Sequence, residues 1–200
     1  KSLGHLLHHS PPIHGCPCCL AKSKAKKHFR KSFDKDDVKH KNEITLDQVT
    51  MTDFSSTLGI GNYRYGVVVW HVQGEFGQFV PLRSLELHEL DRFYREFERV
   101  FGNGGSGPKA AKVVVYCDSH RRLISLCDLH RLARRHPSPG ASNKCPVIER
   151  KINQMLAGIR AYLASGNLPL CFWPLAGECF SFNDNLRMRW DDNGNSYIPY

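Results

Sequence analysis

The chain has 200 residues, of which 41% are hydrophobic and 24% are charged, and its formal net charge at pH 7 is +9. This composition predicts one globular domain with a small appendage and excludes collagen-like and wholly disordered proteins. The apolar runs are far shorter than the roughly 18–20 residues that cross a bilayer, which excludes a membrane-spanning helix and predicts no membrane partner. The first residue is Lys1, with no apolar signal segment behind it, so we expect a fragment of a longer protein.

The basic charge is concentrated at the N-terminus. Residues 1–33 contain seven lysines and arginines and no acidic residue, whereas the other 167 residues carry 21 basic and 19 acidic residues. A basic segment on a nearly neutral body favours a polyanionic partner, most commonly nucleic acid, and a solvated tail is the alternative. The lysines of this segment that we predict to bind DNA phosphates are Lys22, Lys24, Lys26 and Lys27.

Three of the eight cysteines lie within four residues, and the other five are spread through predicted strands and helices. This distribution is unlike a secreted disulfide scaffold and indicates a reducing compartment. Cys16 and Cys19 have the Cys-x2-Cys spacing that holds one Zn²⁺, and His5 and His9 would complete a tetrahedral site. A His-rich tail that binds no metal is the competing interpretation. Alternative ligands close by are His8, His14 and Cys18.

The first half of the body predicts strands followed by a helix. Segments rich in β-branched and apolar residues, at 44–51, 65–72 and 77–82, predict three strands. Ser84 then predicts the start of a helix with one apolar stripe, and Gly102 predicts its end.

The second half predicts a further strand and two helices. The segment 112–117 is apolar on both faces, as expected for a central strand. Residues 125–135 predict a short basic helix. After a loop rich in Pro, Gly and Ser, an apolar stripe predicts a long helix over 147–165 that Gly166 ends.

These elements predict a basic His/Cys module over 1–33, a polar linker over 34–42, a core of strands and helices over 43–182 and a polar tail over 183–200. Three strands of a meander followed by helix-linked strands indicate a mixed α/β sheet with flanking helices. A ribonuclease-H-like, five-stranded sheet has this arrangement, although the element order also fits other α/β folds.

Three acidic residues occupy positions from which a carboxylate could bind a metal. Asp47 lies inside the first strand, Asp118 directly follows the central strand, and Glu149 lies in the first turn of the long helix. If the strands of Asp47 and Asp118 are antiparallel neighbours, we expect these acids to converge. Three carboxylates can hold two Mg²⁺ ions for an in-line phosphoryl displacement. Asp53 is a weaker alternative to Asp47.

Each of these acids also has an ordinary structural explanation. A carboxylate in the first turn of a helix is favoured by the helix dipole, and an Asp at the end of a strand often forms a turn. Any one of them alone is therefore weak support for a metal site.

Several segments together resemble the integrase region of copia-type retrotransposon Pol polyproteins. They are GHLLHHSPPIHGCPCCLAKSKAKKHF, ITLDQVTM, KVVVYCDSHRRL and PVIERKINQMLAGIRAYLASGNLP followed by FWP. The resemblance covers nearly the whole chain. The polar tail is similar to the start of the segment that follows the integrase core in these polyproteins, so we expect a missing downstream region.

The resemblance implies a DNA integrase, a polynucleotidyl transferase that trims the DNA ends of the element and then joins them to target DNA. It implies that Asp47, Asp118 and Glu149 bind two Mg²⁺ or Mn²⁺ ions and that a zinc-binding module precedes the core. It further implies that Arg150 and Lys151 hold DNA phosphates. We also expect a homo-oligomer that acts in the nucleus, is otherwise cytoplasmic and is not secreted.

The chain departs from the family pattern at several positions. Ser119-His120 and Cys145-Pro146 replace the Asn and Asn-Gly that commonly flank the second and third acids. The gap between the His pair and the Cys pair is short, and so is the gap between the second and third acids. An inactive or repurposed nucleic-acid-binding module derived from an integrase is therefore the alternative function, and a nuclease for RNA–DNA hybrids is a weaker one.

Overall fold

The computed structural model describes residues 5, 15–19, 43–51, 58–72, 74–101, 113–117, 120–135, 146–190 and 194–198. Predicted site residues outside these ranges are Asp118, the alternative Asp53, the ligand candidates His8, His9 and His14, and the lysines Lys22, Lys24, Lys26 and Lys27. No helix in the described part of the chain is long and apolar enough to cross a membrane.

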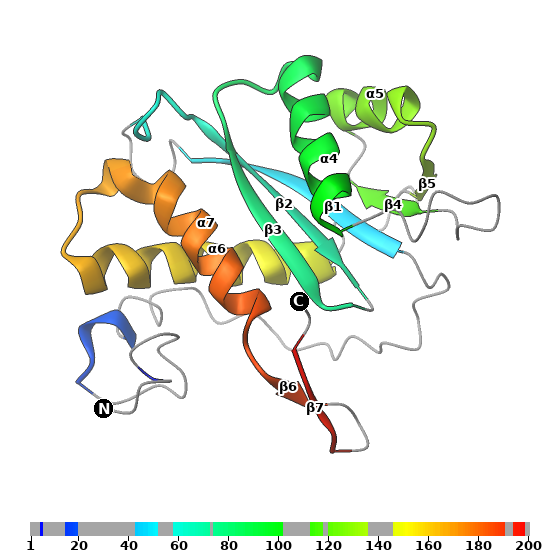
Figure 1. Cartoon of the computed structure of the whole chain (residues 1–200). Coiled ribbons are helices and arrows are strands. Elements are labelled where there is room, and N and C mark those ends of the chain that lie inside the picture. The colour runs from blue at the N-terminus through cyan, green and yellow to red at the C-terminus, as the bar shows by residue number, and fades with distance from the viewer. Residues whose placement is uncertain are drawn as a thin grey trace.

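A mixed five-stranded sheet forms the centre of the molecule (Figure 1). In spatial order its strands are β3 (Phe76–Leu82), β2 (Tyr65–His71), β1 (Glu43–Thr50), β4 (Val114–Cys117) and β5 (Ala133–Arg135). The first three strands are antiparallel to one another, and β4 and β5 run parallel to β1. This order and these directions confirm the predicted ribonuclease-H-like fold with a mixed five-stranded sheet.

The predicted antiparallel pairing of the strands next to Asp47 and Asp118 is wrong. β4 pairs with β1 in parallel, with Leu46 opposite Cys117. Parallel neighbours need a crossover connection, and here the helix α4 (Leu87–Phe101) lies in the chain between β3 and β4. The parallel direction brings the middle of β1 beside the carboxyl end of β4.

The predicted helix over 125–135 is also wrong in its extent. The helix α5 spans Arg121–Leu129, and Arg131 then adopts a left-handed backbone conformation with φ 52°. A non-glycine residue in this region breaks a right-handed helix, so the chain leaves α5 and enters the edge strand β5. The guanidinium of Arg135 on β5 donates to the carboxylate of Glu43 on β1 at 2.7 Å.

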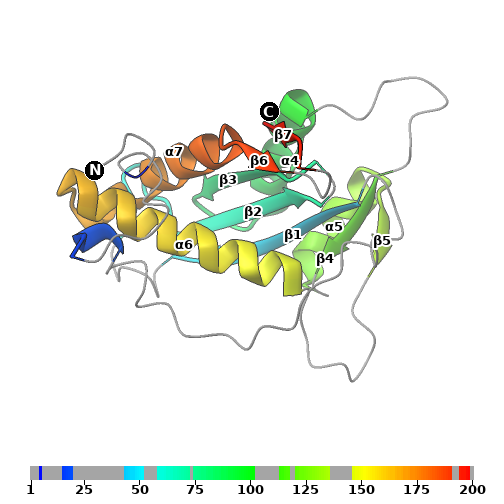
Figure 2. The same ribbon diagram turned by 90° about the horizontal axis from the view of Figure 1, so that it is seen from below.

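The sheet separates two hydrophobic cores because successive side chains of a strand point to opposite faces. On one face Ile44 and Leu46 pack with α4 and α5. On the other face Val68 and Trp70 pack with α6 (Pro146–Gly166) and α7 (Trp173–Asn185). Figure 2 shows α6 lying along the sheet below β1 and β2. The long helix α6 extends one residue beyond its predicted range at each end. It covers the face of the sheet on which Asp47 and its cross-strand partner Val68 lie.

The C-terminal part contains elements that the sequence did not predict. A short 3-10 helix (Leu170–Phe172) leads into α7, and the strands β6 (Arg189–Trp190) and β7 (Ser196–Tyr197) form a small antiparallel hairpin. The side chain of Asn185 at the end of α7 accepts a hydrogen bond from the N–H of Gly77 and donates one to its carbonyl, at 2.9 and 2.7 Å. These bonds tie α7 to the edge strand β3.

Candidate active site and metal-binding cluster

Asp47 lies in the middle of β1 on the face of the sheet covered by α6. It is paired with Val68 on β2, and side chains paired across two strands share a face. Val68 belongs to the core beneath α6 and α7. Asp47 is partly buried, and its Oδ1 accepts a hydrogen bond of 2.7 Å from the N–H of Gln48. The carboxylate is therefore oriented by the backbone of its own strand.

The register of β1 and β4 relates Asp47 to the second predicted acid. Leu46 and Cys117 are partners in the parallel ladder, and Asp47 and Asp118 are the next residues of the two segments. Asp118 itself is outside the described residues.

Glu149 lies in the first turn of α6, as predicted, and is partly buried. Its neighbour Ile148 is buried in the core between α6 and the sheet, and the partly buried Tyr116 of β4 packs against the same core. The start of α6 is thus held against the sheet next to β4. The structure places Asp47 and the element that carries Glu149 on the same side of the sheet.

Carboxylate oxygens on this face are ligands that suit hard divalent cations. Mg²⁺ and Mn²⁺ prefer oxygen donors, and Mg²⁺ is commonly held by one or two protein carboxylates while it keeps positions for water and phosphate. Asp47 and Glu149 supply two such groups from two different elements. Pro146, which departs from the family pattern, is the first residue of α6 and suits that position, because proline is well tolerated at the start of a helix.

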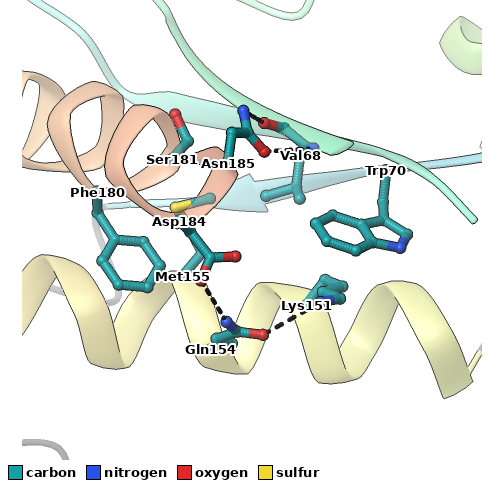
Figure 3. A pocket seen from close by; sticks show the side chains of 10 residues that line it. Val68, Trp70, Lys151, Gln154, Met155, Phe180, Ser181, Asp184 and Asn185 are labelled. Carbon is teal, nitrogen blue, oxygen red and sulfur yellow. Dashed lines mark hydrogen bonds between the residues drawn. The ribbon is translucent and has the colours of Figure 1, made fainter. Parts of the chain in front are cut away.

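The two predicted phosphate contacts on α6 have different surroundings. Arg150 is exposed, whereas Lys151 is partly buried beneath α6. The ammonium of Lys151 lies 3.4 Å from the centre of the Trp70 ring and donates to Oε1 of Gln154 at 3.4 Å (Figure 3). Burial lowers the pKa of this ammonium from its ordinary 10.5 to about 8.

A chain of polar side chains continues from Lys151 toward the C-terminal hairpin. The amide of Gln154 donates to Asp184 at 3.2 Å, and Arg189 donates to Asp184 and to Glu75, each at 3.2 Å. The guanidinium of Arg189 also lies 5.4 Å from the centre of the Trp70 ring. No local sequence pattern indicates this network, because its members come from α6, α7, the β2–β3 turn and β6.

His120 is a further residue near the candidate site. It is the N-cap residue of α5 and follows Asp118 by two positions. Its Nδ1 is buried and has no hydrogen-bond partner in the described part of the chain. In the sequence, His120 stands out only as a departure from the pattern of the family that the chain resembles.

A separate cluster near the N-terminus joins three of the predicted zinc ligands. One ligand atom each from His5, Cys16 and Cys19 lies within 4.8 Å of the others, and all three residues are buried. Cys19 Sγ is 3.8 Å from Nε2 of His5. The described residues of this group fit a metal that prefers sulfur and nitrogen ligands, such as Zn²⁺. The fourth predicted ligand, His9, lies outside the described residues.

Comparisons with known proteins give a structural likeness only. No family model and no curated protein matches the chain. A solved structure of the catalytic core domain of BIV integrase is similar over 80% of this chain and 91% of that one, with 12% sequence identity and a TM-score of 0.49. At this identity and score the likeness carries no information about chemistry, and the fold assignment depends on the order and directions of the strands.

Proposed function

We propose that the chain is the catalytic region of a copia-type retrotransposon integrase, an enzyme that transfers phosphoryl groups of DNA. The parallel register of β1 and β4 is the observation that carries the proposal. It makes Asp47 and Asp118 the next residues after the paired Leu46 and Cys117. Glu149 enters from a helix packed over the same sheet face. The proposal requires the carboxylate of Asp118 to lie on this face too.

In this proposal Asp47, Asp118 and Glu149 hold two Mg²⁺ or Mn²⁺ ions. When bound, such ions activate the attacking oxygen and stabilise the leaving oxygen of an in-line displacement. The N–H of Gln48 keeps the Asp47 carboxylate oriented. The buried Ile148 fixes the first turn of α6 and thereby the position of Glu149.

Basic residues are proposed to hold the DNA backbone. Arg150 is exposed beside Glu149, so its guanidinium can contact a phosphate next to the acids. Lys151 would have to leave Trp70 and Gln154 to do so, and it is the less favoured of the two contacts. The lysines at 22, 24, 26 and 27 are proposed to supply sequence-independent attraction to DNA.

We propose zinc as the metal of the N-terminal cluster, with His5, Cys16 and Cys19 as ligands and His9 as the fourth. The buried, converging imidazole and thiol groups support this assignment. Zinc in such a closed site has a structural role, because no ligand position remains for a substrate.

Self-association is supported by an apolar stripe on α7. Leu175 and Phe182 are 50% and 55% exposed, and with Cys179 and Leu186 they recur at the helical spacing i, i+4, i+7, i+11. Most soluble oligomers are symmetric homo-oligomers, in which a two-fold axis pairs such a surface with itself. We therefore propose a homo-oligomer. From the resemblance to integrases we further propose that it acts on DNA in the nucleus and is otherwise present in the cytoplasm.

The test is an activity assay on labelled DNA duplexes and RNA–DNA hybrids with Mg²⁺ or Mn²⁺. We expect the chain to join a DNA end to a target duplex, and we expect Asp118→Asn to abolish joining. Joining that survives Asp118→Asn would contradict the site. Cleavage of hybrids alone would identify a ribonuclease, and salt-sensitive DNA binding without cleavage would identify a non-catalytic binding module.

A further inference from the structure

The outer face of α6 carries an alanine that the sheet cannot bury. Ile159 and Leu163 of α6 are buried in the core against the sheet. Ala161 lies two residues from each of them, about 200° around a helix of 3.6 residues per turn, and so it points away from that core. Ala161 is nevertheless 0% exposed.

The His/Cys module is what covers this alanine. Cys16, Cys18 and Cys19 form one buried cluster with Ala161, separate from the two cores of the sheet. Cys18 also makes a side-chain hydrogen bond with Ser165, one turn further along α6. Figures 1 and 2 both show the short helical segment of the module beside the C-terminal end of α6.

The three thiols of the module therefore have two different tasks. Cys16 and Cys19 converge with His5 and offer metal ligands, whereas the side chain of Cys18 is hydrogen-bonded to Ser165 of α6. Cys16 and Cys19 are both candidate metal ligands and members of the cluster with Ala161. A metal that orders these two residues as ligands therefore also orders the surface that packs on α6.

We infer that metal binding by His5, Cys16 and Cys19 stabilises the helix α6, so that loading of the module braces the helix that carries Glu149. The inference uses the zinc site of the proposed function but not its DNA chemistry. Coupling is reciprocal: if the metal strengthens the packing on Ala161, then that packing strengthens metal binding by the same factor.

The experiment is amide hydrogen exchange of the whole 200-residue chain, with zinc and with a chelator, and with no DNA present. If the amides of α6 exchange only when the helix opens, and if opening releases the metal, bound zinc lowers the population of the open state. Free zinc at 100 times its Kd then slows amide exchange by about 100-fold. We expect slowing of this kind, up to that limit, in the C-terminal half of α6, and no such effect in the variant Cys19→Ser.

Ala161→Gln tests the contact itself, and Ala164→Gln is the matched control because Ala164 is exposed on the same helix. A larger side chain at 161 must displace the thiols that pack there, so we expect at least tenfold weaker zinc binding, as for coupling of about 1.4 kcal/mol. We expect Ala164→Gln to bind zinc as the parent chain does. Ser165→Ala, which removes only the hydrogen bond to Cys18, covers the case in which Ala161→Gln does not fold.

Three results would each overturn the inference. The parent chain could fail to bind zinc, or zinc could bind without changing the exchange of α6. The third result is that Ala161→Gln and Ser165→Ala both bind zinc as tightly as Ala164→Gln. None of these results concerns DNA joining, so the inference and the proposed phosphoryl transfer fail separately.

Discussion

The buried ammonium of Lys151 makes a measurable prediction about stability at alkaline pH. Its folded-state pKa of about 8 lies below the ordinary value of 10.5. Each unit corresponds to 1.36 kcal/mol, so at pH 7 the charged form of Lys151 costs the folded state about 3 kcal/mol. Between pH 8 and pH 10.5 the unfolded chain binds more protons than the folded chain, and this contribution to the free energy of unfolding therefore rises with pH.

The perturbation is Lys151→Met, which keeps an unbranched side chain of similar length over Trp70 but removes the charge. We expect the free energy of unfolding of the parent chain to rise by about 2 kcal/mol more than that of the variant between pH 8 and pH 10. Urea titrations monitored by circular dichroism measure this difference. Other groups that titrate between pH 8 and pH 10 contribute equally to both chains, so their contributions cancel in the comparison. Arg150→Met, one residue away on the exposed surface, is the control.

Equal pH dependence of the parent chain and Lys151→Met would refute the assignment of Lys151 to the interior of the α6–sheet contact. A loss of DNA affinity in Lys151→Met as large as that in Arg150→Met would show that Lys151 leaves Trp70 to contact phosphate.

Three further predictions concern α7 and the DNA surface. Asn185→Ala leaves the buried N–H and carbonyl of Gly77 without their side-chain partner and should lower the free energy of unfolding by about 2–3 kcal/mol, measured by urea denaturation. Phe182→Glu should shift the chain toward monomer in analytical ultracentrifugation, whereas Leu129→Glu, on exposed α5 surface, should not; equal behaviour would remove α7 as the self-association surface. Arg150→Gln should weaken DNA binding and reduce the slope of log K against log salt by about 1, and an unchanged slope would exclude a phosphate contact.

The sequence predicted those features of the fold that depend on local periodicity. The strands β1 to β4, the helix α4 and the long helix α6 follow from apolar patterns, and so do the positions of Asp47 in mid-strand and Glu149 in a first turn. β5 has only three residues, Ala133–Arg135, with two arginines and no apolar alternation. A strand this short is defined by its neighbour β4, and no local pattern identifies it.

Features that depend on tertiary contacts could not be predicted. The parallel direction of β4 relative to β1 depends on the path of the chain through α4, which periodicity does not encode. The resemblance implies a phosphate contact for Lys151 as for Arg150, and only the packing of α6 on Trp70 shows that Lys151 is partly buried. The helix α7 has apolar residues on both its buried and its exposed sides, such as Phe180 and Phe182, so its sequence does not show which side faces the core.

The catalytic assignment is tested most directly by an assay of DNA strand transfer with Mg²⁺ or Mn²⁺. The assay compares the parent chain with Glu149→Gln. The matched control is Glu178→Gln, the same change at an exposed acidic residue of α7. The proposed site predicts metal-dependent joining by the parent chain and by Glu178→Gln, and its loss in Glu149→Gln although that variant remains folded and binds DNA. Joining by Glu149→Gln at the rate of the parent chain would contradict the proposed site.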